Sequence, residues 1–414
     1  MLFQSILIYV ASFVGIFSSV FFLLTLFEHR EKVKNPVPTK FPFVSVIIPA
    51  YNEGKNIKKT IESVQNLEYG GKFEIIVVDD GSKDNTLNIA KKIAATDPRI
   101  RVLHQENKGK AAAINFAIAK SKGEFIATLD ADSFVEKDAL MKMIGFFEDK
   151  KVAAVTPSLK VYQPKTIVQK IQKVEYLWGI FLRKVFSFMN ALHVTPGPFS
   201  IFRRSFFDKY GGFDEKNPTE DTEIAFRIQT HHYKIENSID AVVYTVSPSK
   251  FKDLLVQRIR WYYGLMKNVK LYPHLFNPKY GYIALFSLPA AILSVLMIIS
   301  LVGYFTFKLI MTMAQNFANW KAVGFDFLTL MQGFKIEYLY YSLTGPLTAL
   351  IIILTLFNIL FLIFAEMKSK EKEIVDTAYI YYFCLYAYFY ALWWVAALFY
   401  WVFGRVKWKD INYE

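Results

Sequence analysis

Hydrophobic and polar positions divide this chain into two apolar ends and a charged middle. Most acidic and basic residues lie within 28–280, whereas long uncharged stretches cover 5–27, 282–307, 340–365 and 378–403. Each stretch supplies the roughly 20 apolar residues that a helix needs to cross a hydrocarbon core of about 30 Å. The pattern predicts an integral membrane protein whose polar domain is inserted between the first span and the others.

Basic residues predict which side of the membrane the polar domain occupies. The first stretch lacks a basic leader and a clear small-residue cleavage site, so we expect a retained anchor of the cell membrane. Four basic residues follow it directly: Arg30, Lys32, Lys34 and Lys40. By the positive-inside rule they place 28–280 in the cytoplasm.

The C-terminal charges complicate the number of spans. A cytoplasmic loop is also indicated by Lys368, Lys370 and Lys372. A simple four-span count would then leave three basic residues outside, namely Arg405, Lys407 and Lys409. One of the C-terminal stretches is instead expected to be re-entrant or interfacial, and the sequence leaves the number of spans open.

Net charge and cysteine content narrow the classes of partner. The formal net charge is +13, but no nucleic-acid-binding motif accompanies it. We expect the basic excess to meet anionic membrane lipids rather than nucleic acid. The single cysteine, Cys384, lies in an apolar stretch, which excludes a disulfide framework and a cysteine metal cluster.

Strand and helix patterns alternate through the first part of the polar domain. Apolar strands are predicted at 44–49, 73–78, 100–104 and 124–129, and helices at 52–65, 84–95 and 110–121. This alternation predicts an α/β fold with a mostly parallel sheet, whose ligands bind at the carboxyl ends of the strands. Beyond 155 the pattern changes. An amphipathic helix over 167–192 lies either in the membrane interface or on the sheet, and 251–272 is predicted to be interfacial as well.

Acidic residues follow two of the predicted strands. Asp79 and Asp80 end the second strand, and Asp130 and Asp132 end the fourth. An isolated Asp-x-Asp is most often a solvated turn. Here a buried strand presents both carboxylates at the ligand-binding edge of the sheet, and such oxygen ligands suit Mg²⁺ or Mn²⁺ bridged to a diphosphate.

Two further segments carry residues suited to a nucleotide. Pro49-Ala-Tyr-Asn-Glu53 ends the first strand, and Tyr51 and Glu53 could frame a base, although Glu53 also suits a helix start. Lys110 begins a helix, where a phosphate would meet an ammonium and the positive end of the helix dipole. Read alone, Lys110 is equally a surface lysine.

The last two segments with candidate site residues precede the C-terminal membrane region. Glu220 and Asp221 lie at a predicted helix start, either as N-terminal capping residues or as a general base. In the segment Gln257-Arg-Ile-Arg-Trp261, Gln257 and Arg260 suit a diphosphate and Trp261 suits a sugar face. Interfacial anchoring is the alternative for the Arg and Trp residues.

In this order the motifs resemble those of the membrane-embedded inverting glycosyltransferases of family 2. That family includes cellulose, hyaluronan, chitin and poly-N-acetylglucosamine synthases, and the layout is most similar to the last. The resemblance covers about 44–261 and the flanking spans. It implies a GT-A-like (Rossmann-like) cytoplasmic domain and a UDP-sugar donor, of the UDP-GlcNAc or UDP-glucose type, with Mg²⁺ or Mn²⁺. The acceptor would be a growing glycan.

The resemblance assigns a role to each candidate. Donor binding would fall to Pro49, Tyr51, Glu53, Asp79, Asp80, Lys110, Asp130, Gln257 and Arg260. Asp130 and Asp132 would ligate the metal, Asp221 with Glu220 would be catalytic, and Trp261 would bind the acceptor. Two segments depart from the pattern of the resembled family and leave the product open. Thr195-Pro-Gly-Pro-Phe-Ser200 stands on the acceptor side, where hyaluronan and cellulose synthases usually place a Cys or a small residue nearby. Ser133 follows the metal carboxylates, where cellulose synthases tend to have a His.

Three functions remain open. A processive polymerase would push its glycan through the spans, which form a narrow conduit unless the chain dimerises or has a small membrane partner. A transferase would add one sugar to a lipid carrier or lipid-linked glycan. A degenerate scaffold is disfavoured, because every motif carboxylate is present. The expected organisation is an anchor at 1–27, the cytoplasmic domain at 28–250, an interfacial region at 251–280, a membrane region at 281–404 and a tail at 405–414.

Overall fold

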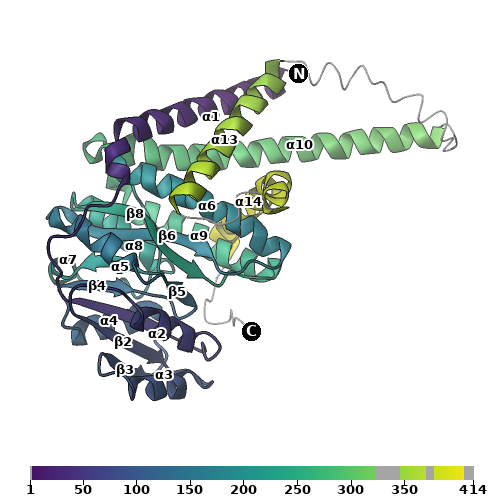
Figure 1. Cartoon of the computed structure of the whole chain (residues 1–414). Helices are drawn as coiled ribbons and strands as arrows, with labels where there is room; N and C mark the ends of the chain where they lie inside the picture. Colours follow the sequence, from purple (N-terminus) through teal and green to yellow (C-terminus); the bar gives the residue numbers. More distant parts are fainter. Residues whose placement is uncertain (1, 323, 325–345, 370–376, 405–414) are drawn as a thin grey trace.

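The computed structural model describes residues 2–322, 324, 346–369 and 377–404, so part of the predicted 340–365 stretch and the 405–414 tail lie outside it. Four helices are long and apolar enough to cross a membrane, and they fall on the four predicted stretches. They are α1 (Leu2–Glu28), α10 (Leu288–Ala322), α13 (Pro346–Lys368) and α14 (Thr377–Phe403). In Figure 1, α1, α10 and α13 lie at one end of the molecule, on one side of the sheet domain.

The first half of the sheet is parallel, as the sequence pattern predicts. Its strands are β1 (Val44–Ala50), β2 (Phe73–Asp80), β3 (Ile100–Gln105) and β4 (Phe125–Thr128). β2 pairs with β1 and with β3, and β4 pairs with the other side of β1. All three pairings are parallel, so the carboxyl ends of these strands meet at one edge.

The second half makes the sheet mixed and was not predicted. Its strands are β5 (Ser133–Val135), β6 (Val152–Val161), β7 (Ser200–Arg203) and β8 (Lys234–Thr245). The full order is β3-β2-β1-β4-β7-β6-β8-β5, in which β7 runs antiparallel to both β4 and β6. The sheet is therefore mixed: β4–β7, β6–β7 and β5–β8 are antiparallel, and the other pairs are parallel.

Helices cover both faces of the sheet and bury its apolar side chains. One core contains side chains of α2 (Ile57–Gln65), α3 (Thr86–Ala94) and α5 (Ala139–Ile144). The opposite core contains side chains of α4 (Lys110–Lys120), α7 (Arg204–Tyr210) and α8 (Glu220–Thr230). Short helical turns complete the chain: η1 (Arg30–Val33), η2 (Gly145–Glu148), η3 (Pro273–Phe276), η4 (Pro278–Tyr280) and the π-helical η5 (Ile283–Ser287).

One helix starts later than its sequence predicts. The pattern places a helix over 52–65, but α2 begins at Ile57. Asn52 has a φ of 55°, and its backbone N–H donates to Ser82 Oγ at 3.0 Å. The N–H of Gly54 donates to Asp84 at 2.9 Å. These contacts hold 52–56 as a turn against the loop that follows β2, because they replace helical hydrogen bonds.

Two helices join the sheet domain to the membrane helices. They are α6 (Ile167–Phe188) and α9 (Phe251–Leu271). α6 packs against β6 and β8 and also against α13 and α14, so it combines the two alternatives that its amphipathic pattern allowed. α9 packs against α8 and α14. Figure 1 shows α6 and α9 between the sheet domain and the membrane helices.

Candidate active site

A cavity of about 2080 Å³ opens at the carboxyl ends of β1, β2 and β4. It continues between α9, α10 and α14. All but one of the predicted site residues line it, from positions far apart in the chain: Pro49, Tyr51, Glu53, Asp80, Lys110, Asp130, Asp132, Glu220, Asp221, Gln257, Arg260 and Trp261. The fold therefore brings together residues that the sequence only places in order.

Asp79 is the exception among the predicted residues. It is fully buried at the end of β2 and is not among the residues that line the cavity. One of its carboxylate oxygens lies 2.7 Å from Nδ1 of His104 on β3. Its role in donor binding stays a prediction, whereas its neighbour Asp80 does line the cavity.

Asp80 organises the loop that leads to Lys110. Its carboxylate accepts hydrogen bonds from the backbone N–H groups of Lys108 at 3.0 Å and Gly109 at 2.9 Å. Gln105 donates to the same carboxylate at 2.7 Å. The loop that opens α4 is thus tied to the end of β2, which fixes the position of Lys110 in the cavity.

Lys110 lies between acids from two different parts of the chain. Its Nζ is 2.5 Å from Asp130 Oδ1 and 3.4 Å from Glu220 Oε1. Burial lowers the pKa of Lys110, but Asp130, Glu220 and Asp221 raise it above the ordinary value, so the ammonium stays charged. Gly197 packs against this pair: a Cβ there would lie 2.7 Å from Lys110 Nζ and 2.9 Å from Asp130 Oδ2.

Asp130 and Asp132 form an electrostatically acidic site. Burial, together with the nearby carboxylates of Asp130 and Glu53, raises the pKa of Asp132 to about 7. Among the described residues, no group of three or more His, Cys, Asp or Glu side chains is arranged to hold a metal ion. A Mg²⁺ or Mn²⁺ ion fits the excess of negative charge here, provided that a diphosphate and water complete its ligands.

Asp221 lies in the first turn of α8, where its carboxylate faces the cavity. Burial and the adjacent Glu220 raise the pKa of Asp221, while Lys110 and Arg260 lower it; the net value is about 6. The backbone carbonyl of Asp221 accepts hydrogen bonds from Thr195 N at 3.1 Å and Oγ1 at 2.8 Å. A carboxylate with a raised pKa that stays largely ionised at neutral pH is suited to act as a general base.

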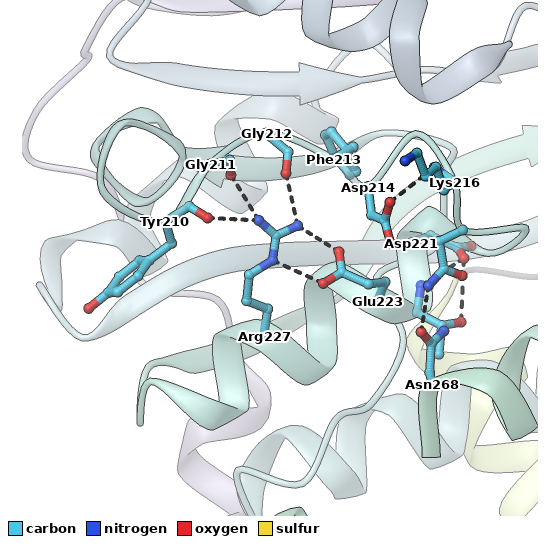
Figure 2. A network of polar contacts seen from close by, with 12 residues as sticks. Tyr210, Gly211, Gly212, Phe213, Asp214, Lys216, Asp221, Glu223, Arg227 and Asn268 are labelled. Atoms are coloured by element: carbon cyan, nitrogen blue, oxygen red, sulfur yellow. Dashed lines mark hydrogen bonds and ion pairs between the residues drawn. The ribbon is translucent and has the colours of Figure 1, made fainter. Parts of the chain in front are cut away.

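A polar network holds the segment around Asp221 in place (Figure 2). Arg227 on α8 donates to the Glu223 carboxylate at 2.6 Å and to the Gly212 carbonyl at 2.8 Å, and so fixes the preceding loop. Asn268 of α9 accepts a hydrogen bond from the Asn217 side chain at 2.7 Å and donates one to the Thr219 hydroxyl at 3.1 Å. The base candidate is thus positioned from both α8 and α9.

The Gln257–Trp261 segment lies on α9 and faces the same cavity. Arg260 Nη1 contacts the Pro218 carbonyl at 3.4 Å, and its buried Nε has no hydrogen-bond partner among the described residues. Arg258 lies over the Trp261 ring, 4.0 Å from its centroid. The Nη2 atom of Arg258 donates to Glu175 Oε2 of α6 at 2.6 Å. The Trp261 platform is thus supported by a buried ion pair.

Several residues of this site escaped the reasoning from sequence. Glu175, Tyr176 and Arg183 of α6 line the cavity, and Gly197 approaches the Lys110–Asp130 pair. Their sequence segments show amphipathic and proline-rich patterns, which carry no local signal of a site. The polar residues of the amphipathic α6 were the only sequence signal that this helix does more than pack against apolar neighbours.

Comparison with known proteins agrees with this geometry. Residues 45–211 match the family model described as glycosyl transferase family 2. This stretch is less than half of the chain, and over it the chain is similar to that family. The predicted resemblance is therefore confirmed for this stretch, which ends before Asp221 and the Gln257–Trp261 segment.

Characterised relatives and one solved structure extend the comparison. The chain is 34% identical over 224 residues to the poly-beta-1,6-N-acetyl-D-glucosamine synthase of Staphylococcus aureus (strain COL), covering 53% of this chain and 54% of that protein. The Staphylococcus epidermidis synthase is 32% identical over 223 residues, with coverage of 53% and 54%. The match spans about half the length of these relatives.

The solved structure is a mannosyltransferase from Pyrobaculum calidifontis in complex with GDP-Man and Mn²⁺. It aligns with a TM-score of 0.54 at 21% identity and covers 87% of this chain and 99% of that one. At this identity the likeness concerns the fold. It confirms the predicted GT-A-like glycosyltransferase domain flanked by candidate membrane helices.

Proposed function

We propose that this chain transfers N-acetylglucosamine from UDP-GlcNAc to a growing polysaccharide, with inversion at the anomeric carbon. The printed names of the staphylococcal relatives support the sugar and the product. The observation that carries the proposal is the single cavity, because it joins Asp221 and the Asp130–Asp132 acids to a groove between the membrane helices. A donor bound at the sheet and a glycan leaving along the membrane helices would share this space.

The donor would lie across the carboxyl ends of β1, β2 and β4. Tyr51 and Glu53 would contact the uracil base, and Lys110 and Arg260 would meet the diphosphate. Asp130 and Asp132 would hold a Mg²⁺ or Mn²⁺ ion, which when bound supplies positive charge to the diphosphate oxygens. The excess of carboxylates around Asp132 supports this assignment.

Asp221 would act as the general base. Its carboxylate takes the proton of an acceptor hydroxyl while that oxygen forms a bond to the anomeric carbon. The bond between this carbon and the diphosphate oxygen breaks, and UDP leaves with the electron pair. Lys110 and Arg260 stabilise the negative charge that develops on the leaving group. Trp261 would stack on the acceptor sugar that receives the new unit.

The orientation and assembly of the protein follow from the same proposal. Basic residues after α1 support a cytoplasmic domain at the inner face of the cell membrane, where UDP-sugars are made available. A processive enzyme with so few spans would complete its conduit with a second copy or a small membrane partner. A transferase adding one sugar to a lipid-linked acceptor is the second candidate, favoured by the aliphatic side chains that α10 contributes to the cavity.

The test uses the purified full-length chain in detergent or nanodiscs. It is incubated with radiolabelled UDP-GlcNAc, UDP-glucose or UDP-galactose and Mn²⁺ or Mg²⁺, and the products are sized. UDP-GlcNAc-dependent polymer is the expected result, and Asp221→Asn should abolish it while UDP binding remains. Lipid-extractable products with one added sugar would favour the second candidate. Absence of UDP release from every donor would overturn both.

A further inference from the structure

Arg183 is a half-buried cation to which the proposed reaction assigns no role. It lies on α6 and lines the same cavity as Asp221 and Trp261. Its Nε and Nη2 atoms are buried, and neither has a hydrogen-bond partner among the described residues. Unpaired buried N–H groups are costly, so the position of this side chain calls for a ligand.

The surroundings of Arg183 lack a neutralising acid. No ion pair of Arg183 occurs within the described part of the chain. The neighbouring Tyr176 hydroxyl is neutral at neutral pH, because burial raises its pKa to about 12. Burial lowers the pKa of Arg183 to about 10, so it still carries its charge at neutral pH. A sugar hydroxyl would satisfy its N–H groups but leave the charge uncompensated, whereas an anion satisfies both.

A glycine makes room for this guanidinium in the middle of α6. A Cβ at Gly179, one turn before Arg183, would lie 3.1 Å from Arg183 Nη1. Glycine inside a helix is less favourable than alanine. Gly179 also lines the cavity. The α6 surface is thus opened at the point where the guanidinium reaches the cavity.

His193 lines the same cavity as Arg183 and contacts the start of the membrane helices. The Nδ1 atom of His193 lies 3.1 Å from Oγ of Ser287, which immediately precedes Leu288 at the start of α10. From there one face of α10 lines the cavity over about 16 Å, at 1.5 Å per residue. The lining residues of α10 are all aliphatic: Leu288, Ala291, Ile292, Val295, Leu296 and Ile299. The facing residues of α14 are Tyr390, Trp394, Leu398 and Trp401.

The aliphatic α10 side of the groove suits a hydrocarbon chain, since it offers sugar hydroxyls no hydrogen-bond partner, whereas the aromatic α14 side suits a glycan. A ligand with a phosphate at one end and a hydrocarbon chain at the other would match Arg183 and the aliphatic side of the groove. We propose that Arg183 binds the phosphate of a lipid whose hydrocarbon chain lies along the aliphatic α10 side, as the lipid-linked end of the acceptor. The identification of this lipid as acceptor rests on the proposed function, whereas its binding does not.

Binding is measured without any donor, on the full-length protein in non-ionic detergent. The probes are dodecyl phosphate, dodecanol and inorganic phosphate, and the readouts are thermal shift and titration. Dodecyl phosphate should raise the Tm of the wild type, and Arg183→Met should weaken its binding about 10- to 100-fold. Arg183→Lys should retain part of the binding, and Gly179→Ala should reduce it. Without ligand, Arg183→Met should be at least as stable as the wild type, because an unpaired buried charge is removed.

The matched control is Arg30→Gln, which removes the same charge at an exposed position after α1. It should bind dodecyl phosphate as the wild type does. Equal binding by Arg183→Met, or equal binding of dodecanol, would overturn the phosphate site. Inorganic phosphate binding as tightly as dodecyl phosphate would overturn the lipid chain. UDP-GlcNAc turnover is assayed separately, so a chain that binds dodecyl phosphate but releases no UDP refutes the proposed function alone.

Discussion

Arg258 Nη2 lies 2.6 Å from Glu175 Oε2, and this contact joins α9 to α6 beneath the Trp261 ring. The Arg258 side chain is fully buried, and that of Glu175 is 17% exposed. α6 packs on the sheet and on α13 and α14, so the pair connects the Trp261 platform to the membrane helices. The Trp261 platform lies beyond the family 2 match, and its orientation therefore depends on α6, a helix inside that match.

Removing one partner of this pair should destabilise the protein. Glu175→Leu leaves the Arg258 guanidinium buried and uncompensated, which costs about 3–5 kcal/mol when a buried pair is broken. We expect a lower Tm and a loss of sugar transfer, measured by thermal unfolding and by UDP release on the purified protein.

A double variant separates stability from positioning. Glu175→Leu with Arg258→Met removes both charges and should recover most of the stability lost by the single change. It should not recover transfer, because Trp261 loses the cation over its ring. Recovery of full activity in the double variant would show that the pair serves stability alone.

The rate of transfer should fall in acid as Asp221 becomes protonated. Burial and Glu220 raise the pKa of Asp221 to about 6, and only the ionised carboxylate can accept the acceptor proton. Activity is thus present above this pKa and lost below it, so kcat/KM should drop about tenfold per pH unit under pH ~6. The profile is measured at saturating Mn²⁺, with UDP binding followed in parallel. A profile that stays flat well below pH 6 would argue against Asp221 as the base.

The parallel half of the sheet could be predicted because its own residues carry the pattern. β1 and β2 are buried along their whole length, and each ends in polar residues that turn into a helix or loop. All but one of the site residues predicted from the order of the motifs line the cavity. β8 could not be predicted, since it buries polar residues such as Asn237, which donates to Thr156 of β6 at 3.1 Å. The buried polar positions of β8 are explained only by their hydrogen bonds to β6.

The same limit applies to the site. Glu175 and Arg258 are separated by 83 positions, and the sequence gives no sign that they pair. Gly197 reads as part of a proline-rich turn, although it packs against Lys110 and Asp130. The start of α2 differs from the prediction for a similar reason, because Ser82 and Asp84, which lie in another loop, accept hydrogen bonds from the backbone of 52–56. Contacts between distant segments determine these features.

A methyl group at position 197 should disturb the diphosphate site. In Gly197→Ala the new Cβ would lie 2.7 Å from Lys110 Nζ and 2.9 Å from Asp130 Oδ2, so this pair must move. Misplacement of catalytic groups by about 1 Å can cost about 100-fold in rate, and we expect a loss of about 10- to 100-fold in turnover. Gly303→Ala on α10 is the control, since the structure places no described heavy atom within 4 Å of its Cβ. Equal losses in both variants would contradict the assignment.

Removal of divalent metal should abolish transfer, and the Asp130–Asp132 acids should set how much metal restores it. Burial raises the pKa of Asp132, and the carboxylates of Asp130 and Glu53 add to the rise; a cation would relieve the negative charge of these neighbouring acids. EDTA should therefore stop UDP release, and Mn²⁺ or Mg²⁺ should restore it. Since even the loss of a residue that only supports a ligand costs about 10- to 100-fold in metal affinity, Asp132→Asn should raise the Mn²⁺ concentration for half-maximal activity by at least about tenfold. Asp208→Asn, an exposed acid of the same domain, should leave that concentration unchanged. Full activity in EDTA, or an unchanged Mn²⁺ requirement in Asp132→Asn, would remove these two carboxylates as the metal site.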